Sequence, residues 1–183
     1  IVVLTSDSRC SCKLVPFGKT LPDQIIEMGI AEQNLVGVAS GLSIAGKKVF
    51  AVSPACFLTA RSLEQIKNDV AYSDHPVKLI GISAGLSYGA LGSTHHSLHD
   101  FAVLRAIHNI DVVVPADNLE TRAAIRAAVA HPRPVYIRLG KKVMPDVHAA
   151  GTPFQIGRAI TIQEGSDVSF IAVGETVHRA VQA

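Results

Sequence analysis

The sequence predicts an α/β fold in which a parallel sheet carries helices on both of its faces. Short apolar segments rich in Val and Ile alternate with helix-forming segments over residues 1–140. Such uniformly apolar strands are typical of parallel sheets that are covered on both sides, because neither face of the strand meets water. The 183 residues, 48% of them hydrophobic, suffice for one well-formed core and the start of a second.

The strands are predicted from short apolar runs that are bounded by Pro, Gly or polar residues. Pro54 closes one of these runs and Pro76 precedes another. The predicted strands are residues 1–4, 25–28, 48–53, 77–83, 111–114 and 135–139.

The helices are predicted from apolar periodicity and from capping residues. The first is rich in Gly and Ala, which would let another helix approach closely, and the last is opened by Asp117 or Asn118 as its cap. Two polar or glycine-rich segments, 5–24 and 84–94, are expected to be loops. The predicted helices are residues 35–46, 58–72, 98–107 and 119–129.

The C-terminal part differs in composition. Residues 141–166 show little periodicity and are interpreted as a linker, while 168–173 and 175–181 are predicted as a strand and a helix. We therefore expect one domain over 1–140, a linker over 141–166 and the truncated start of a second α/β domain over 167–183. Because the sequence starts inside a strand without Met and stops inside a helix, we expect it to be part of a longer polypeptide.

Composition argues against several classes of function. The net charge is +2 with scattered Lys and Arg, so nucleic-acid binding gets little support, and no apolar run is long enough for a membrane span. Three cysteines, with Cys10 and Cys12 as a lone C-x-C pair, indicate neither a disulfide framework nor a zinc site. A cytoplasmic location is expected, although a targeting peptide ahead of Ile1 would not be visible here.

Polar and aromatic side chains follow several of the predicted strands. Glu32, Phe57, the 84–95 loop and Arg138 each come just after one. Ligands of parallel sheets bind beyond the carboxyl ends of strands, so these residues mark a candidate site. Glu32 is the most informative, because an acid near a buried helix is costly unless it is paired or has a function. Its simpler interpretation is a first-turn acid favoured by the helix dipole.

Several motifs occur in a fixed order between Ile26 and Arg138. They are G-I-A-E-Q-N at 29–34, F-L-T-A-R at 57–61 with E-Q-I-K-N at 64–68, G-S-T-H-H at 92–96, V-P-A-D at 114–117 and P-V-Y-I-R-L-G at 134–140. Together they resemble the pyrimidine-binding module of the transketolase family of thiamine diphosphate enzymes.

The resemblance implies a role for three of these residues. Glu32 would hydrogen-bond N1′ of the cofactor's aminopyrimidine, so that the 4′ nitrogen can take the proton from the thiazolium C2. Phe57 would stack on the pyrimidine ring, where the alternative is an ordinary core Phe. His95 would face the thiazolium and the substrate oxygens. A metal site at His95, His96 and His99 is disfavoured because adjacent histidines point in different directions, and His99 is expected on a helix surface.

The same resemblance bears on the substrate. Leu91 stands where transketolases carry an acid that reads a substrate hydroxyl, and Ser83 stands where a histidine often helps to bind sugar phosphate. Arg138 matches a phosphate-binding position, with a surface ion pair as its alternative, and Ser11 is a weaker candidate for the same phosphate site. The catalytic core thus resembles the family more closely than the sugar-binding residues do.

The family binds the cofactor diphosphate through Mg²⁺ on a G-D-G segment that this sequence lacks. The resemblance therefore implies a diphosphate-binding domain or subunit as partner, and Leu4-Thr5-Ser6-Asp7, similar to the start of this module in two-chain enzymes, favours a separate subunit. A homodimer or a heterotetramer is expected, with thiamine diphosphate and Mg²⁺ as cofactors.

The implied function is transfer of a two-carbon ketol unit between sugar-like substrates. Three alternatives stay open: an enzyme like deoxyxylulose-phosphate synthase, a β subunit of a 2-oxoacid dehydrogenase, and a catalytically silent scaffold of the same fold. The histidine segment and Arg138 favour ketol transfer and the enzyme like deoxyxylulose-phosphate synthase over the dehydrogenase subunit. Glu32, Phe57 and His95 argue against the scaffold, because nothing structural demands that trio.

Overall fold

A six-stranded, all-parallel sheet forms the centre of the computed structural model, which describes residues 1–183. In the strand order β2-β1-β3-β4-β6-β5, β2 and β5 form the two edges of the sheet. The last strand of the chain, β6, lies between β4 and β5. The α/β class and the parallel sheet are therefore confirmed. The strands are β1 (Val2–Thr5), β2 (Ile25–Glu27), β3 (Val49–Pro54), β4 (Lys78–Ile82), β5 (Asp111–Val113) and β6 (Val135–Arg138).

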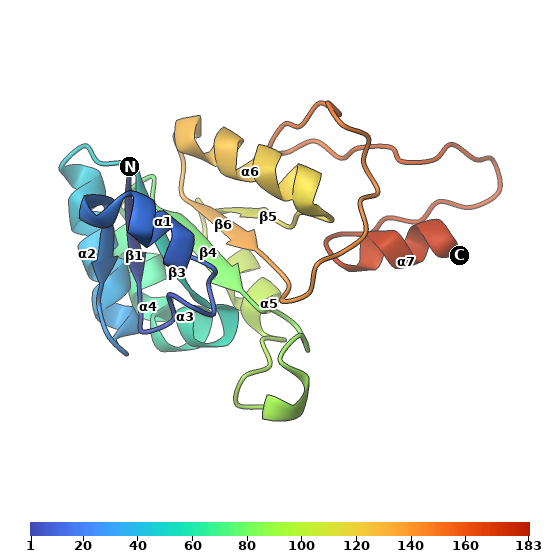
Figure 1. The fold of residues 1–183 in the computed structure, drawn as a ribbon. Helices are drawn as coiled ribbons and strands as arrows, with labels where there is room; N and C mark the ends of the chain where they lie inside the picture. Colours follow the sequence, from blue (N-terminus) through green and yellow to red (C-terminus); the bar gives the residue numbers. More distant parts are fainter.

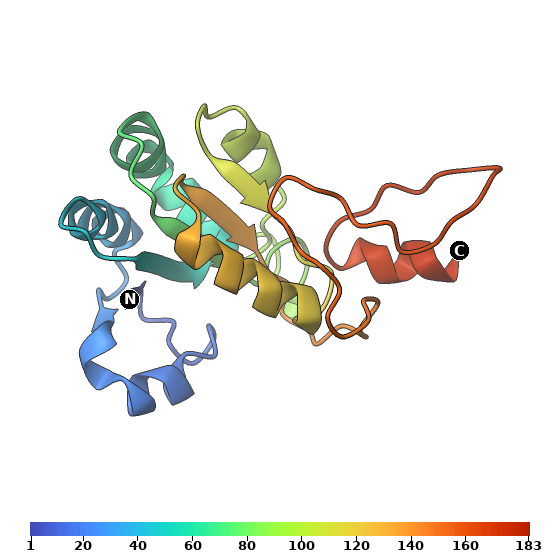
Figure 2. The ribbon, with the colours of Figure 1, turned by 90° about the horizontal axis from the view of Figure 1, so that it is seen from above.

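Helices cover both faces of the sheet, as expected. One face packs against α2, α3, η2 and α5, and the other against α1 and α6; Figures 1 and 2 show the two layers. None of the helices combines the length and the apolar character that a membrane span requires. The helices are α1 (Val15–Thr20), α2 (Glu32–Ile44), α3 (Ala55–Arg61), α4 (Leu63–Gln65), the π-helix η2 (Ile66–Tyr72), α5 (Asp100–Arg105), α6 (Asn118–Ala130) and α7 (Thr176–Gln182), with short 3₁₀ turns η1 (Pro22–Gln24) and η3 (Gly89–Leu91).

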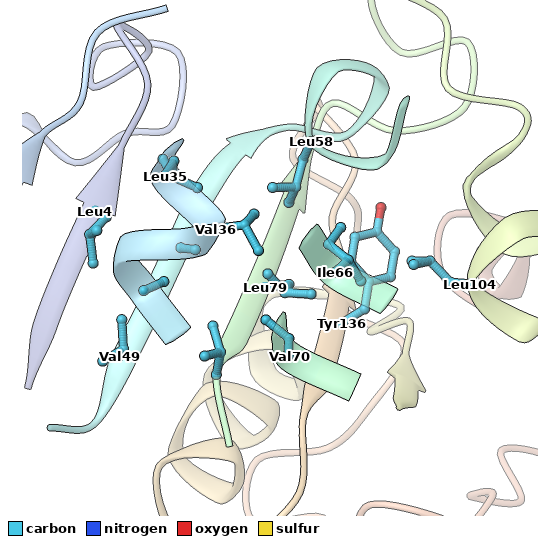
Figure 3. Packing of buried hydrophobic residues seen from close by; sticks show 13 residues of the cluster. Leu4, Leu35, Val36, Val49, Leu58, Ile66, Val70, Leu79, Leu104 and Tyr136 are labelled. Carbon is cyan, nitrogen blue, oxygen red and sulfur yellow. The ribbon is translucent and has the colours of Figure 1, made fainter. Parts of the chain in front are cut away.

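The larger core lies between the sheet and α2, α3 and η2 (Figure 3). Leu35 and Val36 of α2 and Leu79 of β4 are fully buried there. Tyr136 of β6 lies across β4, where a Cβ on Gly81 would collide with its ring and its hydroxyl oxygen. Only glycine leaves room for that ring, so the Gly81–Tyr136 contact fixes how closely this part of the sheet packs.

Two predicted elements in the first half differ from the structure. The expected loop 5–24 contains α1, whose first turn carries Pro16, a residue suited to a helix start. The single helix predicted over 58–72 is instead α3, α4 and η2, and α3 begins already at Ala55. The hydroxyl of Ser62 donates to the Leu58 carbonyl at 2.5 Å. Such back-bonding bends helices, and it explains the break that periodicity alone did not reveal.

The predicted strand at 168–173 is wrong. This segment has no regular structure, and the side chains of Phe170 and Ile171 are 64% and 97% exposed. A strand needs a neighbour for its backbone hydrogen bonds, and no other strand lies beside it here. The helix expected at 175–181 is present as α7. The division of the chain at 140 and 166 stays a prediction.

Asp117 joins α6 to the segment that follows β6. Of the two residues expected as the cap of this helix, Asp117 or Asn118, it is Asp117 whose Oδ1 accepts from the Glu120 N–H at 2.7 Å. Its Oδ2 accepts from the N–H groups of Val147 and His148, both at 2.9 Å, and lies 2.8 Å from the His148 Nδ1. Burial raises the pKa of Asp117, but these hydrogen bonds outweigh burial and lower the pKa to about 2.

The core packing predicts a large effect of Leu35→Ala. The side chain is fully buried, so its removal leaves a cavity and should lower the free energy of unfolding by about 2–5 kcal/mol. Ile44→Ala, on the same helix but 67% exposed, should change it by less than about 0.5 kcal/mol. Chemical denaturation of the two variants measures both values, and equal losses would contradict the assigned core.

Asp117 predicts an acid-sensitive step in stability. A carboxyl whose pKa falls from 3.8 to about 2 on folding stabilises the native chain above pH 4 and loses that contribution as the pH falls toward 2. Wild type should therefore lose about 2 kcal/mol more than Asp117→Asn between pH 5 and pH 2. Denaturation curves across this range give the difference, and parallel pH profiles would contradict the assignment.

Candidate functional site

The predicted site residues gather at the carboxyl edge of the sheet. Glu32 is the first residue of α2, which follows β2, and Phe57 lies in α3, which follows β3. His95 lies in the loop between β4 and α5, which extends from the sheet in Figure 1. Arg138 is the last residue of β6. The parallel strands explain this gathering, since all of their carboxyl ends meet at one edge.

Glu32 is a buried carboxylate with a charged partner. Its side chain is 3% exposed, and Nη1 of Arg61 donates to Oε1 at 3.1 Å and to Oε2 at 3.0 Å. The Arg61 side chain is 47% exposed. Glu32 also opens α2, where the helix dipole favours a negative charge. The first-turn interpretation and a buried functional acid are therefore both compatible with its place in the helix.

Phe57 lies at the centre of a small cluster of rings and charges. The Arg61 guanidinium carbon lies 4.3 Å from the centroid of the Phe57 ring. The His95 ring meets Phe57 edge-on, with centroids 5.2 Å apart. Tyr88 meets His95 in the same manner, also at 5.2 Å, and the Lys141 Nζ lies 4.5 Å from the Tyr88 centroid. Phe57 is half-buried, so it is not an ordinary core residue.

The histidines of the 92–99 segment have separate partners. His95 Nδ1 lies 3.0 Å from the Thr94 hydroxyl, and His96 Nε2 lies 3.1 Å from the Gly89 carbonyl oxygen. His99 was expected on a helix surface, but its Nε2 lies 3.0 Å from the Thr59 hydroxyl of α3 and the residue is half-buried. No group of three or more His, Cys, Asp or Glu side chains is arranged to hold a metal ion.

Arg138 is held by a buried acid. Its Nε donates to Oδ2 of Asp100 at 2.7 Å, and its Nη2 donates to the Ser97 carbonyl at 3.4 Å. Asp100 is fully buried and also accepts from the Tyr136 hydroxyl at 3.0 Å. The ion pair considered for Arg138 therefore exists, but it is a largely buried contact between β6 and α5 and not a surface pair.

The remaining substrate candidates make no hydrogen bond with this ion pair. Ser11 is exposed in the loop between β1 and α1, and no hydrogen bond joins it to Arg138. Ser83 is buried directly after β4, and Leu91 lies in η3 with 55% of its surface exposed. Burial raises the pKa of the Tyr88 hydroxyl, which stands between these two positions in the chain.

Two contributors to the site were missed from the sequence. Arg61 belongs to a quoted motif but received no role, although its spacing of four residues from Phe57 places both on one helix face. Asp100 was passed over as a helix residue, and no local signal predicts that it accepts from both Tyr136 and Arg138. Local spacing could have identified Arg61, whereas the role of Asp100 depends on contacts between segments that are distant in the sequence.

The Glu32–Arg61 pair opens onto a depression of about 580 Å³, which is also lined by Ile30, Ala31, Gln33 and Asn34. A separate cavity of about 260 Å³ lies between α6 and residues 148–160. The second cavity contains none of the predicted site residues. At the first one, the Arg61 guanidinium is the flat group that donates to Glu32 and lies over the Phe57 ring.

Comparisons with known proteins agree with this geometry. Residues 1–146 match the family model of the transketolase pyrimidine-binding domain. A subunit of the apulose-4-phosphate transketolase of Phocaeicola vulgatus is 50% identical over 184 residues, which cover 100% of this chain and 59% of that protein. The subunit of the same name from Actinobacillus succinogenes is 40% identical over 183 residues, again covering 100% and 59%.

Solved structures give the same result. A split-gene transketolase, described as an inactive β4 tetramer, superimposes with a TM-score of 0.89 at 40% identity, covering 99% of this chain and 58% of that chain. The transketolase of Leishmania mexicana shares the fold, with a TM-score of 0.74 at 22% identity over 81% of this chain and 24% of that one. This chain thus spans about three-fifths of the curated relatives that it matches. From the match over residues 1–146, the identities and the fold, the chain belongs to the transketolase family and contains its pyrimidine-binding domain.

Proposed function

We propose that this chain is the pyrimidine-binding part of a thiamine diphosphate-dependent enzyme that transfers a two-carbon ketol unit between sugar-like substrates. The observation that carries the proposal is the buried carboxylate of Glu32, which Arg61 links to the Phe57 ring at the carboxyl edge of the sheet. Membership of the transketolase family supplies the cofactor, because this family uses thiamine diphosphate. That cofactor, when bound, supplies a nucleophilic carbon that can accept and release the two-carbon unit.

The residues present fit an aminopyrimidine ring. Arg61 already places a planar, hydrogen-bond-donating group against Glu32 and over Phe57, which supports the view that this place accepts such a group. Glu32 would hold a proton on its bond to the ring, in surroundings with little water, and so orient the cofactor and promote its activation. Phe57 would fix the plane of the ring through stacking, which contributes about 1 kcal/mol beyond area burial.

His95 is the proposed residue for proton transfer at the substrate. It is half-buried, lies against Phe57 and is carried by a loop at the mouth of the site. A histidine in this place can donate a hydrogen bond to a substrate oxygen as negative charge develops there, and it can return the proton near neutral pH. Thr94 Oγ1, 3.0 Å from Nδ1, would orient the ring so that the other nitrogen faces the substrate.

We infer that the substrate carries an anionic group such as phosphate. The relatives are named for apulose 4-phosphate and for 6-deoxy-6-sulfo-D-fructose, both of which are anionic sugars. Arg138 is the proposed contact for this group, because its Nη1 has no partner in the chain while Nε and Nη2 are fixed. Ser11 stays a weaker candidate. Leu91 cannot accept a hydrogen bond from a substrate hydroxyl, so we expect a substrate without one at that position.

A partner is needed to complete this site. Mg²⁺ and the cofactor diphosphate would be bound by a separate diphosphate-binding subunit, a proposal supported by the relatives that are named as single subunits of a transketolase. The tetramer described for the split-gene relative supports an oligomer, and we propose a homodimer or heterotetramer that functions in the cytoplasm.

A second candidate activity is that of 1-deoxy-D-xylulose-5-phosphate synthase. A relative of that name from Thermomicrobium roseum is 35% identical over 186 residues, which cover 100% of this chain and 29% of that protein. Product analysis separates the two activities, since ketol transfer from a ketose donor releases a shortened aldose, whereas the synthase reaction releases CO₂ from its oxoacid donor.

Glu32→Gln should abolish ketol transfer. The amide keeps the size of the side chain but cannot carry the charge and shared proton, so turnover by the full-length chain with its partner subunit should fall at least about a hundredfold. Glu64→Gln, at an exposed position, serves as the matched control. Circular dichroism should show that both variants are folded. Normal turnover of Glu32→Gln would contradict the proposed function, and an inactive wild-type complex that fails to bind thiamine diphosphate would favour the silent scaffold.

His95→Asn should lower kcat about a hundredfold and change cofactor affinity little, because the proposed role lies in proton transfer. His96→Asn is the control at the neighbouring position, where the ring contacts only the Gly89 carbonyl, and its loss of kcat should be much smaller. Steady-state kinetics and cofactor titration measure these effects. Equal losses in the two variants would assign the histidines to loop structure and remove His95 from the reaction.

A further inference from the structure

Arg61 makes the two contacts that the cofactor ring would need. Its Nη1 donates to both carboxylate oxygens of Glu32, at 3.1 and 3.0 Å, and its guanidinium carbon lies 4.3 Å from the centroid of Phe57. A guanidinium is flat, delocalised and a hydrogen-bond donor, and it stacks readily on aromatic rings. An aminopyrimidine bound to Glu32 and stacked on Phe57 would share each of these properties.

One flat group already occupies the position that contacts both Glu32 and the face of Phe57. Only 3% of the Glu32 side chain is exposed, and its oxygens are approached from the depression that Arg61 lines. A ring with a nitrogen at hydrogen-bond distance from this carboxylate and a plane over Phe57 would overlap the guanidinium. Both groups cannot be there together.

The Arg61 side chain can move away from Glu32 into solvent. It is the last residue of α3, immediately before the break at Ser62, and its side chain is 47% exposed. Its hydrogen bonds go to Glu32 alone, so moving the guanidinium into water leaves no other buried group without a partner. Arg138 is different, because it is 19% exposed and pairs with the fully buried Asp100. The contrast separates an arginine that can be displaced from one that is fixed.

The Arg61–Glu32 pair also stabilises the chain before the cofactor binds. A carboxylate that is 3% exposed and has no partner is strongly unfavourable, so Arg61 provides Glu32 with hydrogen bonds and an opposite charge and holds it in place. When the aminopyrimidine ring binds, it has to replace the Arg61 guanidinium as the hydrogen-bond donor to Glu32. The same contact that stabilises the free chain thus lowers the apparent affinity for the cofactor. The apparent affinity is the intrinsic affinity multiplied by the fraction of chains in which Arg61 and Glu32 are not paired.

We propose that Arg61 competes with the aminopyrimidine for Glu32 and Phe57, so that the guanidinium moves away from Glu32 when the cofactor binds. This proposal rests on the proposed function. It makes Arg61 a residue that controls access to the catalytic acid, and it assigns no chemical step to it. The free energy of the pair, typical of a half-exposed contact, corresponds to about a three- to tenfold effect on binding.

The decisive variant is Arg61→Met, which keeps a long unbranched side chain over Phe57 and removes the donor and the charge. Arg105→Met is the matched control, since Arg105 is also the last residue of its helix and is exposed. Arg61→Lys is the second variant: it retains the charge but lacks the flat donor, so it should fall between wild type and Arg61→Met. It also replaces Arg61→Met as the test variant if the latter does not fold.

The measurement is calorimetric titration of thiamine diphosphate with Mg²⁺ into the full-length chain in complex with its diphosphate-binding subunit. Arg61→Met should bind the cofactor about three- to tenfold more tightly than wild type and Arg105→Met. Without cofactor, Arg61→Met should unfold at a lower temperature than Arg105→Met, and its melting temperature should rise more on cofactor addition.

Each outcome decides between roles. Tighter binding with lower stability of the cofactor-free variant supports competition, which a purely structural arginine would not produce. Equal or weaker binding overturns the proposal and makes Arg61 a permanent part of the site. If wild type, Arg61→Met and Arg105→Met all fail to bind the cofactor, the proposed function itself is wrong, and the competition is wrong with it.

Discussion

The common direction of the six strands is the constraint on which the rest of this structure depends. Each crossover returns the chain to the same end of the sheet, so every strand finishes at the same edge. Helices and loops that begin there, at Glu32, at Ala55 and after Ile82, necessarily lie close together. The position of the site is therefore a consequence of the topology, and the side chains that follow the strands determine its chemistry.

Two buried carboxylates, Asp100 and Glu32, each pair with an arginine, but the two pairs differ in how exposed the arginine is. Asp100 accepts from both Tyr136 and Arg138 and joins α5 to β6 from a fully buried position. Glu32 has a single, half-exposed partner in Arg61. Removing a partner from the first acid would leave an uncompensated charge in the core, whereas the second acid can exchange its partner at the surface. Exposure of the arginine distinguishes the two.

The loop between β4 and α5 carries both His95 and Leu91. Its ends are joined by the bridge between Gly85 and Ser97, which fixes the base of the loop beside the sheet. Gly92 has a φ of 73°, a conformation that suits glycine and that turns the chain into the segment carrying His95. Leu91, just before it, is exposed at the tip. Glu32 and Phe57 lie on helices α2 and α3 and not on this loop, so their backbone positions do not depend on its conformation.

Much of this molecule could be predicted from its sequence because the signals are local. Apolar runs identified the strands, the cap of α6 was narrowed to Asp117 or Asn118, and the positions of Glu32, Phe57 and the 84–95 loop just after predicted strands placed them at one edge of a parallel sheet. Helix α1 was missed because its six residues are too few to show periodicity. The strand expected at 168–173 was wrong because strand formation needs a neighbour that no local pattern reveals. Tertiary structure alone decided that Arg61 pairs with Glu32 and Arg138 with Asp100, because these partners lie 29 and 38 residues apart and meet only when the sheet is assembled.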